Sequence, residues 1–311
     1  MKALSLLLLL PLALFPSVSP ASGEVDPPSR PSVGLALGSG GAGGLAHIAI
    51  LQVFDAAGKP PDQITGSSIG AVIGGLYAAG LGADAILDIF DDFAGSELDA
   101  LTGLAQSEIR LLDVVPLRAE RKALFEAGPF LRFLAKHTEA RDFADLEIPF
   151  AVVATDFRTG DSVVIDEGDL FRAIEASMAV PGLFEPVEYQ GHPFLIDGGA
   201  SNPLPYNLLD DSHDYIVAVD VTGNGTPNET VDIGIADVLF TSFSIMQGSI
   251  VRHMTRLDPP DLYLAPDIGN IRLLHFNRIA EVLRSAQPSA DKLRSQLEAW
   301  GAYRTAPSAR E

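Results

Sequence analysis

Cysteine is absent from this chain of 311 residues. Its absence excludes disulfide bonds, metal sites built on thiolates and a cysteine nucleophile. Positive charge is scarce, because 21 Lys and Arg residues stand against 41 Asp and Glu residues, for a formal net charge of −20 at pH 7. A field of this sign repels phosphate groups, so we expect no nucleic-acid partner and only transient, apolar contact with a membrane surface. A hydrophobic content of 47% with 20% charged residues is typical of a globular protein.

The N-terminal residues have the layout of a secretory signal peptide. Lys2 supplies a positive charge, a mainly apolar run follows from Leu4 to Phe15, and small residues stand at Ser19 and Ala21. The run is too short to span a bilayer comfortably, and no cysteine is present to take a lipid anchor. We therefore expect residues 1–21 to be cleaved and the mature protein to be secreted or periplasmic. An uncleaved anchor is the alternative.

Residues 22–32 contain three prolines and predict a solvated linker. From residue 33 onward, short apolar segments alternate with stretches of helical periodicity, which predicts a three-layer α/β/α fold with a mainly parallel central sheet. The predicted strands are Val33–Leu37, Gln63–Ser67, Phe150–Thr155, Ser162–Ile165, Phe194–Ile196, Tyr215–Val221 and Leu262–Leu264. The predicted helices are Leu45–Ala57, Ile69–Ala79, Ala83–Phe93, Glu120–His137, Leu170–Ser177, Ile235–Met254 and Pro288–Trp300. We expect residues 33–222 to form the main domain and the mostly helical residues 223–311 to complete it.

A glycine-rich loop follows the first predicted strand. Five of the seven residues from Gly38 to Gly44 are glycine. Without Cβ atoms, successive backbone N–H groups can converge on one point, and the positive end of the next helix favours an anion there. The spacing Gly38-x-Gly40-x-x-Gly43 also matches the dinucleotide fingerprint, but no strand ends in an acidic residue about 20 positions later, as a ribose contact requires. The loop therefore predicts an anion site, with a packing turn and a nucleotide site as alternatives.

The pentapeptide from Gly66 to Gly70 lies between a predicted strand and a predicted helix. This is the context of a nucleophile elbow, in which small residues two positions before and after the central residue let the chain turn sharply. The turn exposes the hydroxyl group of the central residue, Ser68, at the positive N-terminus of the next helix. Ser67 is not central. The alternative role of Ser68 is a helix N-cap.

A third motif, Asp197-Gly198-Gly199, follows an apolar segment. A strand delivers the Asp197 carboxyl group directly into a turn with open backbone beside it, and the alternative is an ordinary turn-capping role. Asp156 and Asp220 are rival carboxylates at the ends of predicted strands, but no Gly-Gly pair comes after either. The sequence therefore favours Asp197 as an acidic group at a site.

A serine hydroxyl group needs a neighbouring group that takes its proton. In hydrolases with this elbow the chain order is serine, acid, histidine. Only His213, His253 and His275 follow Asp197, and none of them lies in a small-residue turn. His47 lies on the helix after the glycine loop and is interpreted as a packed or capping side chain. The sequence thus offers a serine, an anion pocket and an acid, without a persuasive imidazole.

In combination, these motifs resemble the patatin-like phospholipases, in particular bacterial members. The glycine loop, the elbow at Gly66–Gly70 and the motif at Asp197–Gly199 have the order and spacing of that family. The segments Ala154–Asp156 and Ala176–Pro181 resemble two further signatures of it. The resemblance covers Val33 to Pro203 and implies a patatin-like fold with a catalytic domain at residues 33–222.

The resemblance implies a Ser–Asp dyad that acts without a metal or cofactor. Ser68 is expected to attack an ester carbonyl group, and Asp197 to take the Ser68 proton and return it to the leaving alcohol. Backbone amides of the glycine loop are expected to hold the oxyanion, and further glycines to shape the two turns. The expected oxyanion donors are Gly38, Gly40, Gly41 and Gly43, and the supporting glycines are Gly66, Gly70, Gly198 and Gly199. One departure is Gly43, because the family often carries arginine at that position.

The leading interpretation is therefore an acyl hydrolase that acts on phospholipids or lysophospholipids. The alternatives are an esterase or thioesterase for small soluble acyl compounds, a hydrolase with a histidine-containing triad, and a non-catalytic nucleotide-binding protein. The motifs do not predict an oligomeric state.

Overall fold

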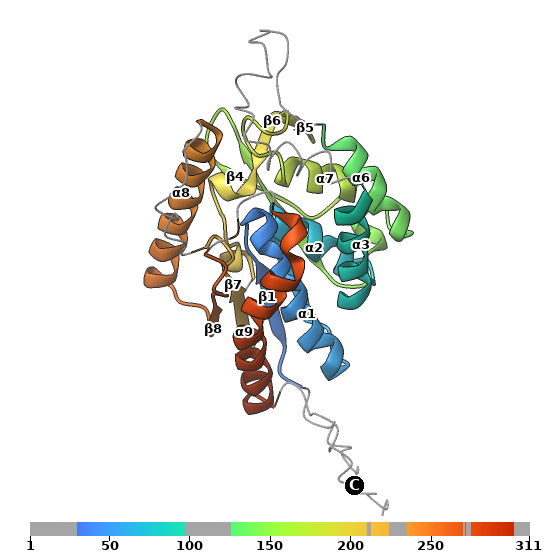
Figure 1. The fold of residues 1–311 in the computed structure, drawn as a ribbon, viewed down its shortest axis with the longest axis vertical. Coiled ribbons are helices and arrows are strands. Elements are labelled where there is room, and N and C mark those ends of the chain that lie inside the picture. Colours follow the sequence, from blue (N-terminus) through green and yellow to red (C-terminus); the bar gives the residue numbers. More distant parts are fainter. Residues whose placement is uncertain are drawn as a thin grey trace, which may run out of the picture.

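The computed structural model describes residues 30–96, 126–209, 213–223, 235–269, 271 and 275–301. Its centre is an eight-stranded sheet (Figure 1), in which hydrogen-bonded strands follow the path β5-β6-β3-β2-β1-β7-β8 and β4 pairs with β3 off this path. The strands are β1 (Val33–Leu37), β2 (Gln63–Ser67), β3 (Phe150–Asp156), β4 (Ser162–Ile165), β5 (Val187–Tyr189), β6 (His192–Asp197), β7 (Tyr215–Val219) and β8 (Leu262–Leu264). The pairs β3–β4, β3–β6 and β5–β6 are antiparallel, and the other pairs are parallel.

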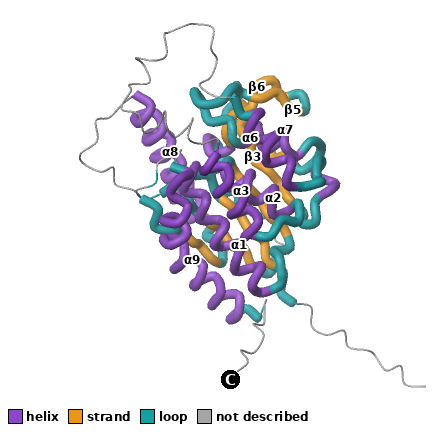
Figure 2. The backbone as a smooth tube through the Cα atoms, turned by 45° about the vertical axis from the view of Figure 1, so that its right-hand side comes forward, coloured by secondary structure: helices purple, strands orange, loops and turns teal. Residues whose placement is uncertain are grey.

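Helices lie on both faces of the sheet because its central strands are apolar on both sides. Leu35 and Leu37 of β1 face the main core, whereas Ala36 faces a second cluster that includes Val251. Figure 2 shows several helices packed over one face, and α8 lies apart from them. The described helices are α1 (Ala46–Ala57), α2 (Ile69–Ala78), α3 (Ala83–Ser96), α6 (Gly128–Leu134), α7 (Leu170–Ser177), α8 (Ile235–Leu257) and α9 (Ile279–Ala299). The expected three-layer α/β/α fold with a mainly parallel sheet is confirmed.

The last helix, α9, begins nine residues earlier than predicted and contains Pro288 in its interior. The predicted helix begins at this proline, a residue that is tolerated best in the first helical turn. Val282, Ala286, Leu293 and Leu297 of α9 are all buried in the main core, where α9 packs along α1. This burial outweighs the hydrogen bond that Pro288 cannot donate, so the C-terminal residues share the core of the preceding elements.

Other boundaries also differ from the predictions. The helix predicted from Glu120 begins at Gly128 within the described residues, and residues 120–125 lie outside them. The strand predicted to reach Val221 ends at Val219, and β5 was not predicted. The predicted signal peptide and residues 22–29 of the predicted linker also lie outside the described residues, so both stay predictions. None of the helices in the described ranges is long and apolar enough to cross a membrane.

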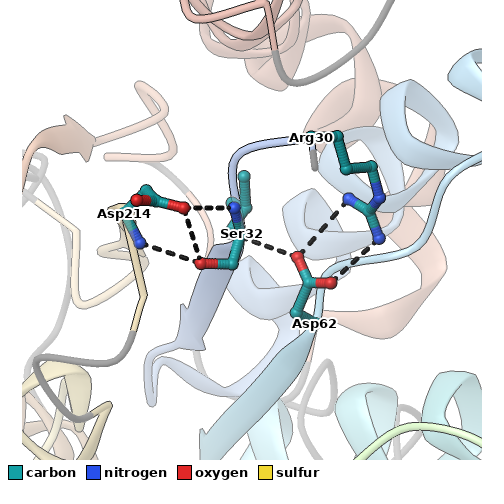
Figure 3. A network of polar contacts seen from close by, with 5 residues as sticks. Arg30, Ser32, Asp62 and Asp214 are labelled. Atoms are coloured by element: carbon teal, nitrogen blue, oxygen red, sulfur yellow. Dashed lines mark hydrogen bonds and ion pairs between the residues drawn. The ribbon is translucent and has the colours of Figure 1, made fainter. Parts of the chain in front are cut away.

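Two carboxylates hold the N-terminal end of β1 (Figure 3). Asp62 accepts hydrogen bonds from the Arg30 guanidinium group at 2.9 Å and from the Val33 amide at 2.8 Å. Asp214 accepts from the Ser32 amide at 2.8 Å and from the Ser32 hydroxyl group at 3.0 Å. These contacts anchor the chain at the end of β1 opposite to the one that leads into the glycine loop.

Candidate active site

Ser68 lies at the sharp turn between β2 and α2. Its backbone has φ 55° and ψ −120°, a conformation that non-glycine residues rarely adopt and that stores strain. The turn packs directly against β1, since a Cβ atom on Gly70 would lie 2.1 Å from the carbonyl oxygen of Leu37. Ser68 occupies the N-cap position of α2, but its side chain makes no capping hydrogen bond. The strained turn therefore presents the hydroxyl group to another partner.

That partner is Asp197, 129 residues further along the chain. The Ser68 Oγ donates a hydrogen bond of 2.6 Å to Asp197 Oδ2. The other carboxylate oxygen, Oδ1, accepts from the Gly199 amide at 2.7 Å. Asp197 is thus both a turn cap and the partner of Ser68, so the two roles considered for it coexist.

The pairing of β3 explains why these two residues meet. Ser67 at the end of β2 lies opposite Val153, and Asp197 at the end of β6 lies opposite the next residue, Ala154. The antiparallel strand β4 pairs with these same β3 residues, so it occupies the other edge of β3. Strands β2 and β6 therefore run toward each other along one edge of β3 and meet end to end, with Ser68 and Asp197 at the junction.

The junction is tightly packed. A Cβ atom on Gly198 would lie 2.1 Å from the carbonyl oxygen of Val153 and 2.7 Å from Ser67 Oγ. Ser67 is fully buried, and its hydroxyl group has no hydrogen-bond partner among the described residues. Only the second serine of the elbow therefore contacts the carboxyl group.

Burial changes the acidity of Asp197. The residue is 0% exposed, and desolvation raises the pKa of its carboxyl group from 3.8 to about 7. The hydrogen bonds from Ser68 and Gly199 act in the opposite direction but do not cancel the effect of burial. A carboxylate with a pKa near 7 is a far stronger base than an exposed one, while it is still ionised at mildly alkaline pH.

Ser177, at the end of α7, supports the junction and was not predicted. Its Oγ accepts a hydrogen bond of 2.8 Å from the Ser68 amide and donates one of 2.6 Å to the carbonyl group of Val153. Thr155 supports the other side, where its Oγ1 donates to the Asp197 carbonyl oxygen at 2.9 Å. Ser177 lies in the segment Ala176–Pro181, but nothing local in the sequence indicates its role.

The glycine loop packs on the elbow, and two of its expected roles must be corrected, those of Gly38 and Gly43. The amide of Gly38 donates to the carbonyl oxygen of Val219 at 3.0 Å, so Gly38 is not an oxyanion donor. A 3₁₀ helix spans Gly41–Leu45, and its geometry directs the amide of its third residue, Gly43, back to the residue before the helix. The amides at the start of such a helix have no carbonyl partner within it, so Gly40, Gly41 and Ala42 are the remaining candidates for oxyanion donors in the loop. Ala42 was missed because the prediction considered glycines alone.

The position at which the family often carries arginine is filled differently in this chain. A Cβ atom on Gly43 would lie 2.5 Å from Cδ1 of Ile268, which is itself buried. An apolar side chain therefore occupies the space that a longer residue at position 43 would enter. The loop offers its backbone amides without a cation at this position.

No histidine contacts the Ser68 or Asp197 side chain in the described part of the chain. His47 is fully buried, and its Nε2 donates to the carbonyl oxygen of Gly38 at 2.9 Å. Burial lowers the pKa of His47 to about 4, so its imidazole is neutral at pH 7. The hydrogen bond from this imidazole to Gly38 supports the glycine loop. His192 contacts Asp156 instead. The described residues contain no group of three or more His, Asp or Glu side chains that could hold a metal ion.

The other strand-end acid, Asp220, has its own partners. It accepts hydrogen bonds from the Thr222 amide and hydroxyl groups and from the Tyr263 hydroxyl group. These bonds stabilise the turn after β7. Asp220 is therefore a structural residue, as the absence of a following Gly-Gly pair indicated.

A pocket of about 380 Å³ lies beside the turn that follows Asp197. Gly199 and Ala200 border it on one side, and residues of α8 border it on the other. The α8 residues that line it are Phe243, Met246, Ser249 and Ile250. The turn that holds Asp197 thus borders a pocket whose far wall is largely apolar.

The fold and the site define a three-layer α/β/α protein with a serine–carboxylate pair at a strained elbow. The patatin-like phospholipase family model matches residues 35–210, more than half of the chain. The chain therefore belongs to the patatin-like phospholipase family.

Relatives of this chain occur in bacteria and in mammals. An uncharacterized NTE family protein of Mycobacterium tuberculosis is 38% identical over 209 residues, which cover 66% of this chain and 53% of the relative. Patatin-like phospholipase domain-containing protein 6 of Mus musculus is 31% identical over 202 residues, covering 64% of this chain and 14% of that protein. Among solved structures, VipD from Legionella pneumophila has a TM-score of 0.47 at 14% identity, covering 86% of this chain and 67% of VipD. The chain matches about half the length of the mycobacterial relative.

Proposed function

We propose that this protein is a serine acyl hydrolase that cleaves carboxylic esters of phospholipids or lysophospholipids. The observation that carries the proposal is the 2.6 Å hydrogen bond from the Ser68 hydroxyl group to the buried Asp197 carboxylate at a strained elbow. Membership of the patatin-like phospholipase family supports the substrate class.

In the first half of the proposed reaction, Ser68 Oγ attacks the ester carbonyl carbon while its proton passes to Asp197 Oδ2. The carbonyl oxygen becomes an oxyanion, which the amides of Gly40 and Gly41 stabilise; one such donor contributes about 3–4 kcal/mol in other hydrolases. Collapse of the intermediate breaks the ester C–O bond. Asp197 then returns the proton to the leaving alcohol, and the acyl group stays on Ser68.

In the second half, Asp197 takes a proton from water, and the resulting hydroxide attacks the acyl-enzyme. Collapse of this second intermediate releases the fatty acid, and Asp197 returns the proton to Ser68. The Asp197 carboxylate can perform both transfers without histidine for two reasons. Burial raises its pKa to about 7, and its Oδ2 atom accepts a hydrogen bond from Ser68 Oγ.

The proposal is tested with a fluorophosphonate probe and an ester substrate. We expect wild-type protein to be labelled at Ser68 and to hydrolyse the ester, and Ser68→Ala to do neither. The matched control is Ser67→Ala, which removes the neighbouring buried hydroxyl group and is expected to keep both activities. Labelling that persists in Ser68→Ala, or a loss of activity in Ser67→Ala alone, would contradict the assignment. An acyl-chain series separates a lipid hydrolase, which favours long chains, from an esterase of small compounds.

We also propose that the protein acts outside the cytoplasm, because residues 1–21 have the pattern of a cleavable signal peptide. N-terminal sequencing of the protein after export is expected to show a chain that begins at residue 22. A mature chain that keeps Lys2 would overturn this part of the proposal.

A further inference from the structure

The outward face of α8 carries an unusual concentration of exposed apolar side chains. Eight large hydrophobic residues are exposed in the part of the chain that the structure describes, and five of them lie on this one helix. They are Val238, Leu239, Ile245, Met246 and Leu257, with exposed fractions between 50% and 72%. Their spacing places them on one side of the helix, and Gln247 and Val251 on the opposite side are buried. Ser242 and Ser249 are exposed between these apolar side chains.

The charge of α8 differs from that of the rest of the molecule. No aspartate or glutamate occurs from Val238 to Leu257, although the chain as a whole has a net charge of −20. Arg252, His253 and Arg256 are exposed at the C-terminal half of the helix. Neither arginine forms an ion pair with any residue in the described ranges. Acidic residues occur only at the two ends of this stretch, at Asp237 and Asp258, so the surface between them meets lipid headgroups without a carboxylate of its own.

The same helix also borders the pocket beside the turn that follows Asp197. Met246 is 56% exposed on the outward face and also lines the pocket beside Gly199 and Ala200. A Cβ atom on Gly199 would lie 2.1 Å from Nε2 of the buried Gln247, so α8 is in close contact with the turn that holds Asp197. The outward face of α8 is therefore continuous with the pocket beside the turn that follows Asp197.

We propose that residues 238–257 of α8 form the surface by which this protein docks on a phospholipid bilayer. This inference rests on the proposed function, since it explains how an ester embedded in a membrane reaches Ser68. An interfacial helix of this kind inserts its apolar side chains to a depth of about 5–10 Å. A second copy of this chain is a poorer occupant, because two molecules of net charge −20 repel each other.

Vesicle co-sedimentation tests the docking surface, with Ser68→Ala protein so that no lipid is consumed. Leu239→Glu/Ile245→Glu changes two exposed residues that do not line the pocket. The matched control is Gln287→Glu/Ser295→Glu, which adds the same two charges on the exposed face of α9. We expect the α8 variant to bind phosphatidylcholine vesicles with an affinity at least about tenfold lower than that of the parent. The α9 variant is expected to bind like the parent. Because the contact is apolar, binding of the parent is expected to persist at high salt. The chain beginning at residue 22 is used beside the full chain, so that the apolar N-terminal residues do not obscure the result.

The same double variants in the active background separate docking from catalysis. We expect the α8 variant to hydrolyse a short soluble ester like wild type, which also shows that it is folded, but to lose most activity on vesicles. Equal vesicle binding by all three proteins overturns the docking surface. A change in oligomeric state without a change in vesicle binding also overturns it and assigns the face to a second copy. If wild-type protein hydrolyses no ester while the vesicle result holds, the proposed function fails and the lipid-binding surface stands.

Discussion

Two serine–aspartate pairs lie at opposite ends of β1, and their comparison shows why we propose a catalytic role for only one of them. At the N-terminal end, Ser32 donates to Asp214 at 3.0 Å; at the C-terminal end, Ser68 donates to Asp197 at 2.6 Å. Both pairs join the same two side-chain types through the same kind of bond. The bond alone therefore does not define a dyad.

The two pairs differ in burial and in backbone geometry. Asp214 is exposed to solvent, and hydrogen bonds from the Ser32 amide and hydroxyl groups lower the pKa of its carboxyl group. Asp197 is buried, and desolvation raises the pKa of its carboxyl group to about 7. Ser68 also has a strained positive φ, whereas Ser32 leads into a regular strand. Burial therefore raises the basicity of the Asp197 carboxylate. The exposed Asp214 carboxylate stays a weak base and holds the chain at the start of β1.

The largest expected difference concerns catalysis. Asp197→Asn removes the group that takes the Ser68 proton, so kcat is expected to fall by about 10³-fold or more. Asp214→Asn is expected to leave kcat unchanged, because this residue lies at the far end of β1. Steady-state hydrolysis of a soluble ester measures both effects. Comparable losses in the two variants would mean that the distinction between the pairs is wrong.

A second difference concerns stability against pH. Because the pKa of Asp197 is raised in the folded state, its contribution to the free energy of unfolding is fully present below pH 4 and is lost as the pH rises through 7. A rise from 3.8 to about 7 corresponds to about 4 kcal/mol. Urea unfolding at pH 5 and pH 8 is expected to show wild-type protein losing stability relative to Asp197→Asn. The pKa of Asp214 is lowered, so this carboxyl group is ionised at both pH values and its contribution to the free energy of unfolding stays constant. Asp214→Asn is therefore expected to lose the same amount of stability as wild type between pH 5 and pH 8.

The smallest expected effect concerns Ser177, which holds the elbow from behind. Ser177→Ala leaves the Ser68 amide and the Val153 carbonyl group buried without this partner, a loss of about 1–3 kcal/mol for each group. We expect a fall in kcat of about tenfold with little change in KM, since the nucleophile is displaced while the pocket is intact. Ser67→Ala is the control, because its hydroxyl group has no partner among the described residues. A larger loss in Ser67→Ala than in Ser177→Ala would contradict this assignment.

Much of the site could be predicted from the sequence because its parts are local. The glycine spacing around Ser68 and the Asp197-Gly198-Gly199 turn are short motifs that indicate sharp turns at strand ends, and the resemblance to the patatin-like phospholipases implied that their side chains pair. The alternation of strands and helices likewise depends on hydrophobic periodicity within each element.

The remaining features depend on contacts between distant segments. Strands β2 and β6 meet end to end only because both pair with β3, and no local pattern encodes that register. The role of Ser177 can be recognised only from the fold, because its hydroxyl group bonds to residues at the junction of β2 and β6. The amide of Gly38 donates its hydrogen bond to the carbonyl oxygen of Val219, a residue of a distant strand. Pro288 lies inside α9 because burial of its neighbours against α1 overrides the local preference.

The central claim is that Asp197 itself is the base for Ser68. The most direct measurement is the rate of fluorophosphonate labelling of Ser68 as a function of pH, in wild type and in Asp197→Asn. Because the base must be ionised, labelling of wild type is expected to rise with pH, with a midpoint at the Asp197 pKa of about 7, and then to level off. Asp197→Asn is expected to label slowly at every pH. Rapid labelling of Asp197→Asn with an unchanged midpoint would show that another group takes the proton.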